Sequence, residues 1–235
     1  EKDRHNFVTN VDKKVELDII ETIRRHYPNH NILAEESGQQ KNQDDEYTWI
    51  IDPIDGTTNF IHGFPHFAVS IAIQHRKRIE HALIYDPIKQ DLFTATRGEG
   101  ALLNQHRMRV TNKPSLESAL LATGMYQSKE TNLALQLKLL HSFVFEAGDI
   151  RRTGSAALDL AYVASGRLDG FFESGLKIWD MAAGCLLIQE AGGLICDFNG
   201  NENYLERGDL ITANPKLFKK MLQLAKPIFT SYGLM

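Results

Sequence analysis

One stretch decides the fold of this chain: Trp49-Ile50-Ile51-Asp52-Pro53-Ile54-Asp55-Gly56-Thr57-Thr58-Asn59-Phe60. Its first residues, with Thr48, are the β-branched and aromatic types that fill a buried strand, and Pro53 ends that strand because proline has no backbone donor. Gly56 adopts backbone angles closed to other residues, so the chain can curl back on itself there. The pattern therefore places Asp52, the Ile54 carbonyl and Asp55 close together at the end of a strand.

This turn is rich in oxygen ligands. Two carboxylates and a carbonyl, with no Lys or Arg in the stretch, suit a hard cation such as Mg²⁺. The hydroxyls of Thr57 and Thr58 could orient a water beside such an ion, and the amides of Gly56 and Thr57 could form an anion nest for a phosphate. The alternative is an ordinary turn, since Asp-Pro and Asp-Gly are common turn dipeptides.

Composition restricts the classes of function. The 235 residues are 43% apolar with a formal net charge of −4, which is typical of a soluble globular protein and disfavours a nucleic-acid surface. No apolar run reaches the ~20 residues of a membrane span. Two cysteines form no disulfide framework, and no signal peptide is evident, so we expect a cytoplasmic protein. No Cys-x₅-Arg loop is present, which disfavours a cysteine phosphatase.

The pattern of expected helices and strands changes near residue 118. Up to residue 117 we expect one helix, over about 10–26, and then strands joined by short turns, which form an antiparallel sheet; the polar segment 38–46 between them is expected to be a loop. From 118 to 235 strands and helices alternate, which predicts a mixed α/β half. The expected strands are 31–34, 66–74, 79–85, 91–96, 101–104, 120–124, 149–153, 168–173, 194–198 and 210–213. The later helices are expected at 132–145, 155–164, 180–191 and 215–224.

Acidic residues outside the turn each have two interpretations. Thr9-x-x-Asp12 has the form of a capping box at the start of the first helix. Glu35 and Glu36 follow a short strand. They either belong to a solvated loop or provide one metal ligand. Asp180 begins a helix, where it is either a simple N-cap or a metal ligand that faces a cleft. Glu173 is a surface acid at the end of a strand or a group that faces a substrate.

Three segments, in order, resemble the signatures of the inositol monophosphatase family. They are 49–60, Glu35-Glu36-Ser37 and Trp179-Asp180-Met181-Ala182-Ala183-Gly184, and the segment from Arg151 to Leu160 is most similar to the bacterial branch. The resemblance covers nearly the whole chain. It implies a layered αβαβα sandwich of the sugar-phosphatase type, in the α+β or α/β class, and an N-terminal helical segment ahead of residue 1.

The resemblance also implies a set of site residues. Glu35, Asp52 and the Ile54 carbonyl would hold one Mg²⁺, and Asp52, Asp55 and Asp180 a second, with two or three ions per site. Asp12 would accept a hydrogen bond from Thr57, which with Glu35 completes the catalytic set. The substrate would contact Glu173, a polyol-binding turn at Gly154, Ser155 and Ala156, and the residues around the metals: Ile54, Asp55, Gly56, Thr57 and Asp180. Lys2 resembles a lysine near the metals.

The implied activity is Mg²⁺-dependent hydrolysis of inositol-1-phosphate by a metal-activated water, with lithium sensitivity and a homodimer as further family properties. Two alternatives stay open. One is a phosphatase for another small sugar or nucleotide phosphate. The other is an interaction protein in a bacterial transcription antitermination complex, because some bacterial relatives have that role.

Overall fold

A computed structural model describes residues 9–42, 44–125 and 130–232. Its first element is helix α1 (Asn10–His26), which begins at the capping box predicted from Thr9 and Asp12. The Thr9 hydroxyl accepts from the Asp12 amide, and the Asp12 carboxylate accepts from the Thr9 amide at 2.8 Å. These reciprocal bonds satisfy amide donors that have no partner within the helix.

An eight-stranded sheet, here called the N-terminal sheet, follows α1 in the order β2-β1-β3-β4-β5-β6-β7-β8. Its strands are β1 (His30–Ala34), β2 (Gly38–Gln40), β3 (Asp44–Asp55), β4 (Ala68–His75), β5 (Arg78–Asp86), β6 (Asp91–Thr96), β7 (Gly100–Leu103) and β8 (His106–Arg107). Neighbouring strands are antiparallel apart from β1 and β3, which are parallel. The predicted antiparallel sheet is therefore correct except at this pair.

A five-stranded C-terminal sheet has the order β10-β9-β11-β13-β12. Its strands are β9 (Leu120–Thr123), β10 (Asp149–Arg151), β11 (Gly170–Glu173), β12 (Leu194–Cys196) and β13 (Leu210–Ala213). Strands β10, β9 and β11 are parallel, whereas β13 runs antiparallel to β11 and β12. This is the mixed sheet that alternating strands and helices predicted.

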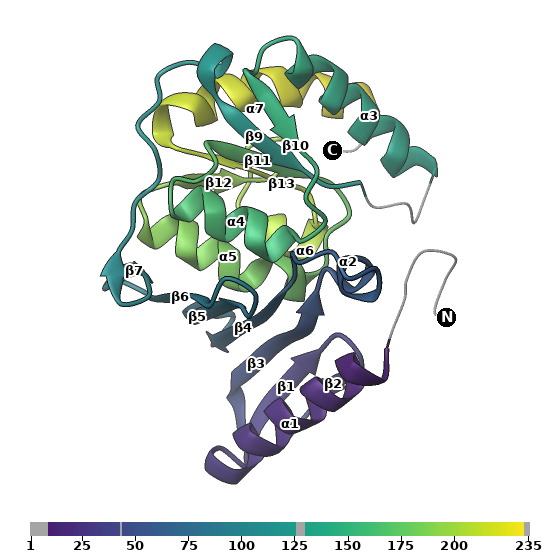
Figure 1. The fold of residues 1–235 in the computed structure, drawn as a ribbon, viewed down its shortest axis with the longest axis vertical. Coiled ribbons are helices and arrows are strands. Elements are labelled where there is room, and N and C mark those ends of the chain that lie inside the picture. Colours follow the sequence, from purple (N-terminus) through teal and green to yellow (C-terminus); the bar gives the residue numbers. More distant parts are fainter. Residues whose placement is uncertain (1–8, 43, 126–129, 233–235) are drawn as a thin grey trace.

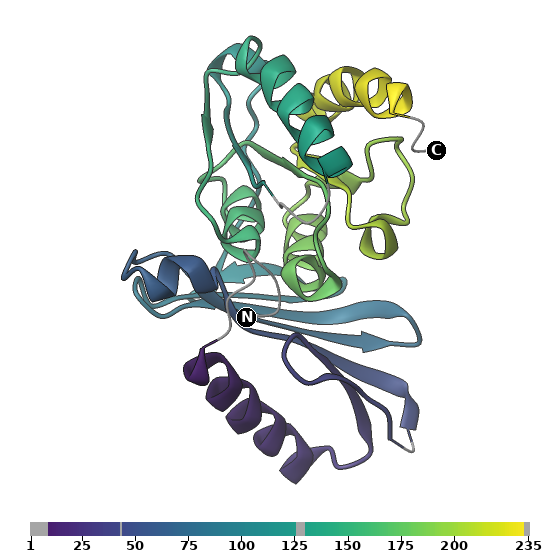
Figure 2. The same cartoon turned by 90° about the vertical axis from the view of Figure 1, so that its right-hand side faces the viewer.

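The helices complete five layers, as Figures 1 and 2 show. After α1 the helices are α2 (Thr57–Ile61), α3 (Glu130–Val144), α4 (Ala156–Ala164), α5 (Ile178–Glu190), α6 (Tyr204–Arg207) and α7 (Pro215–Ser231). Helix α1 lies against the outer face of the N-terminal sheet, α4 and α5 lie between the two sheets, and α3 and α7 cover the far face of the C-terminal sheet. The predicted αβαβα sandwich is confirmed.

The middle layer explains why α4 and α5 are apolar on all sides. Every residue of α5 from Met181 to Ile188 is buried, because one side of the helix faces each sheet. The largest core cluster lies there, and it joins Ile84 and Phe93 of the N-terminal sheet to Leu160, Phe171 and Leu186. In the part of the chain that the structure describes, no helix combines the length and hydropathy needed to cross a membrane.

Two local predictions were wrong. The segment 38–46 was expected to be a loop, but it contains β2 and the start of β3. Strand β2 lies at the edge of the sheet and is half-buried to exposed, so it needs no apolar alternation. Pro53 was expected to end its strand, yet β3 continues to Asp55 with an irregular register between Asp52 and Asp55, where a residue without an amide donor is tolerated.

A candidate metal and phosphate site

Three carboxylates from distant parts of the chain meet at one point. Asp52 and Asp55 end strand β3, and Asp180 lies in the first turn of α5. One oxygen from each lies within 4.8 Å of the others. Glu35, in the turn after β1, hydrogen-bonds Asp52 through its side chain. The structure thus brings together the four acids that the family resemblance implied as metal ligands.

The electrostatics of this acidic cluster are those of a site without counter-charge. Burial raises the pKa of Asp52 well above its ordinary value, and the charges of Glu35, Asp55 and Asp180 raise it further. Burial and the Asp55 charge likewise raise the pKa of Asp180. In the described part of the chain, none of Asp52, Asp55 and Asp180 forms an ion pair with Lys or Arg. Asp52 and Asp55 are buried and Asp180 is half-buried, and such an all-oxygen set of like charges fits hard divalent cations.

The backbone of the turn explains why its residue types are required. The Asp52 Oδ1 accepts a hydrogen bond from the Ile54 amide at 3.0 Å, which fixes the first carboxylate over the turn. Gly56 has a φ of 98°, and a Cβ at this position would lie 3.1 Å from the His66 carbonyl oxygen and 3.2 Å from that of Gly154. Only glycine combines this conformation with this close approach. Helix α2 begins at the next residue, so the Gly56 and Thr57 amides lie at the start of a helix.

Asp180 was expected as the N-cap of a helix beginning at 180, and this was wrong. Helix α5 begins at Ile178 with Lys177 in the N-cap position, so Asp180 is the third helical residue. Its Oδ2 accepts a hydrogen bond from the Lys177 amide at 2.7 Å. One carboxylate oxygen therefore caps the helix while the side chain faces the cluster, so the capping and ligand interpretations are compatible.

Thr57 lies between the turn and helix α1. Its Oγ1 is 3.0 Å from the Ile54 carbonyl oxygen and 3.3 Å from the Asp12 Oδ1. The other oxygen of Asp12 is occupied by the capping box with Thr9, so Oδ1 is the oxygen that faces Thr57. Asp12 is 1% exposed. The capping and catalytic interpretations of Asp12 are thus geometrically compatible.

The start of helix α4 anchors Asp55, a role that sequence reasoning missed. The Asp55 Oδ2 accepts from the Ser155 hydroxyl and, at 2.7 Å, from the Ala157 amide. The Ser155 hydroxyl also accepts from the Leu158 amide, as an N-cap does. The Ala156 amide also hydrogen-bonds Asp55, so two of the three residues of the predicted polyol-binding turn, Ser155 and Ala156, direct donors at Asp55. Burial raises the pKa of Asp55 to about 6, although the donors of Ser155 and Ala157 act to lower it.

Glu173 lies at the end of β11 and is 7% exposed, so it is not a surface acid. Gly124 makes room for it, because a Cβ there would lie about 2.1 Å from the Glu173 carboxylate. Asp159 in α4 is also buried and accepts from the Thr153 hydroxyl at 2.8 Å. Neither Gly124 nor Asp159 was identified from the sequence. Lys2 lies outside the described residues.

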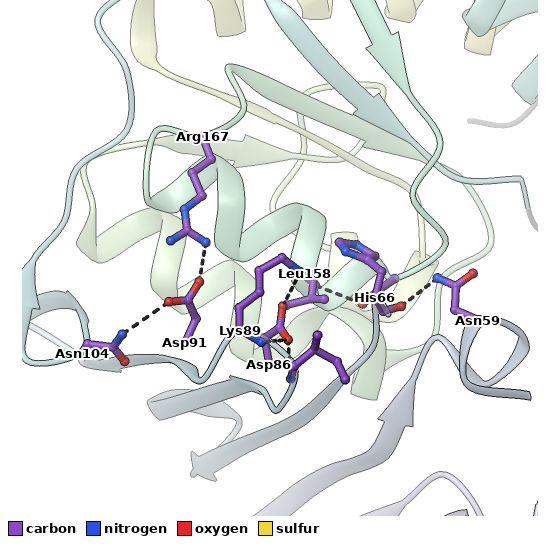
Figure 3. A network of polar contacts seen from close by, with 10 residues as sticks. Asn59, His66, Asp86, Lys89, Asp91, Asn104, Leu158 and Arg167 are labelled. Atoms are coloured by element: carbon purple, nitrogen blue, oxygen red, sulfur yellow. Dashed lines mark hydrogen bonds and ion pairs between the residues drawn. The ribbon is translucent and has the colours of Figure 1, made fainter. Parts of the chain in front are cut away.

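Further polar contacts join the layers around the site (Figure 3). The Asn59 amide group donates to the His66 carbonyl at 2.7 Å and to the Thr153 carbonyl at 2.9 Å, which ties α2 to the segment before α4. Arg167, just after α4, donates to Asp91 of the N-terminal sheet at 2.6 Å. These bonds fix the layer that carries Ser155 against the sheet that carries Asp55.

Glu173 gives a testable pH dependence. Burial, with the charges of Asp159 and Asp55, raises the pKa of Glu173 from 4.5 to about 8. Below pH 4.5 this group is protonated in both folded and unfolded chains; above pH 8 it is ionised in both, and the buried charge lowers stability. The metal-free protein should therefore lose stability as pH rises between these values. For each pH unit by which the pKa of this group is higher in the folded chain than in the unfolded chain, the free energy of unfolding falls by ~1.4 kcal/mol. This corresponds to roughly 3 °C in melting temperature.

The measurement is thermal unfolding in EDTA at pH 5.5 and pH 8.5, for the wild type and Glu173→Gln. The variant should show a fall in melting temperature smaller by at least ~3 °C, since Gln does not titrate. Equal falls in the two proteins would contradict the assigned environment of Glu173.

Neither cysteine suits nucleophilic chemistry. Cys185 in α5 and Cys196 in β12 are buried and form no disulfide. Burial raises the pKa of the Cys185 thiol, and burial together with the Asp197 charge raises that of Cys196 to about 12. Since the thiolate is the reactive form, both groups are inert at neutral pH.

Comparisons with known proteins agree with this geometry. The family model described as the inositol monophosphatase family matches residues 1–228. The chain is 51% identical to the Nus factor SuhB of Pasteurella multocida over 96% of this chain and 85% of that protein. The solved structure of extragenic suppressor protein suhB from Bartonella henselae matches with a TM-score of 0.93 and 42% identity, over 96% of this chain and 86% of that one. Inositol monophosphatase from Anabaena matches with a TM-score of 0.86 and 38% identity, over 92% and 86% of the two chains.

Proposed function

The chain belongs to the inositol monophosphatase family, and on that premise we propose that it is a Mg²⁺-dependent phosphomonoesterase that converts inositol-1-phosphate to inositol and phosphate. One observation carries the proposal: Asp52, Asp55 and Asp180 converge within 4.8 Å in a partly buried site without ion-pair partners among the described residues. Such a cluster is costly unless cations bind it. The proposed division into halves 1–117 and 118–235 assigns Asp52 and Asp55 to one half and Asp180 to the other.

The residues have separate tasks in this proposal. Glu35, Asp52 and the Ile54 carbonyl would hold one Mg²⁺, and Asp52, Asp55 and Asp180 a second. The ions would supply Lewis-acid stabilisation of both the attacking and the leaving oxygen of the phosphoryl transfer. The Thr57 hydroxyl would donate a hydrogen bond to Asp12, which leaves an Oγ1 lone pair to accept one from the attacking water. The Gly56 and Thr57 amides would receive the phosphate.

The substrate hydroxyls would be bound on the wall opposite β3. Glu173 would supply a buried acceptor there, and the Gly154–Ala156 turn would supply backbone groups other than the Ala156 amide. Because a buried acceptor selects ligands that carry a matching hydroxyl, this wall favours a polyol phosphate over a plain phosphomonoester. The name of the Anabaena relative, inositol monophosphatase, supports inositol as the polyol of this substrate.

The test is phosphate release from inositol-1-phosphate in Mg²⁺ and in EDTA, beside fructose bisphosphate and p-nitrophenyl phosphate. We expect release only with Mg²⁺ and the highest kcat/KM for inositol-1-phosphate. Glu173→Gln should raise KM for inositol-1-phosphate by about tenfold, the worth of one hydrogen bond, and leave KM for p-nitrophenyl phosphate almost unchanged. Equal kcat/KM for all three substrates in the wild type would contradict the polyol assignment.

A second candidate function is participation in a transcription complex, which the name Nus factor of the Pasteurella relative favours. It is compatible with catalysis, because a surface for RNA polymerase components need not include the acidic cluster. Capture of purified RNA polymerase by the wild type and by Asp52→Asn separates the two: equal capture assigns the role to the surface alone. Cytoplasmic location, a homodimer and inhibition by lithium complete the proposal.

A further inference from the structure

Helix α1 carries a second buried acid one turn beyond Asp12. Glu16 is 2% exposed, and it lies on the same face as Asp12, Ile20 and Ile23, which points toward the N-terminal sheet. A carboxylate buried in this way lowers stability unless hydrogen bonds replace its hydration. The partners of Glu16 therefore indicate why an acid occupies this position.

Both oxygens of Glu16 accept hydrogen bonds from the turn that follows β1. The Glu36 amide donates to Oε2 at 2.8 Å, and the Ser37 amide donates to Oε1 at 2.9 Å. The amide just before them, that of Glu35, donates to the Ile51 carbonyl at 3.1 Å. Three successive amides are thus held, one by strand β3 and two by the carboxyl group of Glu16. Hydrogen bonds to a charged acceptor are about twice as strong as neutral ones.

The two hydrogen bonds to Glu16 fix the backbone next to Glu35, the residue whose side chain contacts Asp52. Glu35 carries the carboxylate that hydrogen-bonds Asp52, and the orientation of that side chain depends on the backbone of the turn. We infer that Glu16 is a positioning residue that holds Glu35 in the geometry required for cation binding; this inference rests on the proposed metal-dependent function.

Helix α1 therefore contacts two separate parts of the site. Asp12 faces Thr57, and Glu16, four residues later, fixes the turn of Glu35. Residues at this spacing lie on one face of a helix, about 6 Å apart along its axis. Helix α1 thereby sets the position of Glu35 relative to Thr57.

The test measures cation binding directly, with the metal-free protein and Mn²⁺ as the probe. Glu16→Gln keeps one acceptor oxygen but places an amide NH₂ against the second backbone donor. Free Mn²⁺ is counted by electron paramagnetic resonance during a titration. We expect one Mn²⁺ equivalent to bind at least about tenfold more weakly, as is typical when a group that orients a ligand is lost. The equivalent assigned to Asp52, Asp55 and Asp180 should bind as in the wild type.

The matched control is Glu21→Gln, which removes an acid of the same charge from the exposed side of α1. It should bind Mn²⁺ as the wild type does. In turnover assays, Glu16→Gln should raise the Mg²⁺ concentration for half-maximal rate by about tenfold and leave kcat at saturating Mg²⁺ nearly unchanged. A residue that only supported the fold would change the melting temperature without this selective effect on one cation.

Wild-type Mn²⁺ binding by a folded Glu16→Gln would overturn the inference. If that variant does not fold, Glu16→Asp, which keeps the charge on a shorter side chain, is titrated in its place, and failure of both to fold would also overturn it. The proposed function fails separately: if Mn²⁺ binding depends on Glu16 as expected but the wild type releases no phosphate from inositol-1-phosphate, the activity is contradicted and the positioning role stays intact.

Discussion

Replacing Asp52 with Asn is expected to lower kcat for phosphate release by on the order of 10³-fold or more, about 4 kcal/mol in the activation free energy. Asp52 is the acid common to both proposed cation sites, and in the structure it meets Glu35, Asp55 and Asp180. Asn retains an oxygen that accepts from the Ile54 amide, so the turn should keep its shape. The loss would therefore report the missing charge. Steady-state phosphate release in saturating Mg²⁺ measures it.

The same variant should be more stable than the wild type when metal is absent. Burial and like charges raise the pKa of Asp52, so its ionised form destabilises the metal-free fold at neutral pH. In EDTA the melting temperature of Asp52→Asn should rise, whereas in Mg²⁺ the wild type should be the more stable protein. Asp18→Asn, an exposed change on α1, serves as the control for loss of one negative charge. An Asp52→Asn protein with more than a tenth of wild-type kcat would contradict the assignment.

Thr57→Val is expected to lower kcat by about 100-fold, the lower range of effects for groups that assist proton transfer. Its hydroxyl lies between the Ile54 carbonyl and Asp12, where it can accept from a water once its own proton points to Asp12. Val fills nearly the same volume but offers no hydroxyl. Because Thr57 contributes no carboxylate to the acidic cluster, Mn²⁺ affinity should stay within a few-fold of wild type.

Thr57→Ser is the matched control, since it restores the hydroxyl and removes only a methyl group. It should recover most of the wild-type kcat. If Thr57→Val and Thr57→Ser had equal kcat values, the hydroxyl would have no part in the reaction. If Thr57→Val instead lost Mn²⁺ binding, its effect would arise from the cation site.

The helices and strands of the five-layer fold could be predicted because their signals are local or repeated, whereas their layering was implied by the family resemblance. The helix at Asn10–His26 shows its start in Thr9-x-x-Asp12, and the alternation of strands and helices after residue 118 predicts a mixed sheet. Strand β2 has no such signal, because a polar strand at a sheet edge resembles a loop until its partner is known. Pro53 misled for a related reason: its effect on a strand depends on whether a neighbour needs the missing donor.

The residues of the candidate site also fall into two groups, those that could be inferred from local sequence and those that could not. Asp52, Asp55 and Gly56 are adjacent in sequence, so their turn could be inferred from residue types alone. That Asp180 lies beside them required the family resemblance or the structure, since no local rule brings residues more than a hundred positions apart together. The anchoring of Asp55 by Ser155 and of the Glu35 turn by Glu16 was invisible, because each partner is a side chain or amide from a distant segment.

The most direct test of the central claim is a crystal structure of this protein grown with Mn²⁺, with anomalous scattering used to locate the ions. The account predicts Mn²⁺ among the carboxylates of Asp52, Asp55 and Asp180, and a second ion between Asp52, Glu35 and the Ile54 carbonyl. A map at saturating Mn²⁺ without density at the acidic cluster, or with ions only elsewhere on the molecule, would contradict it.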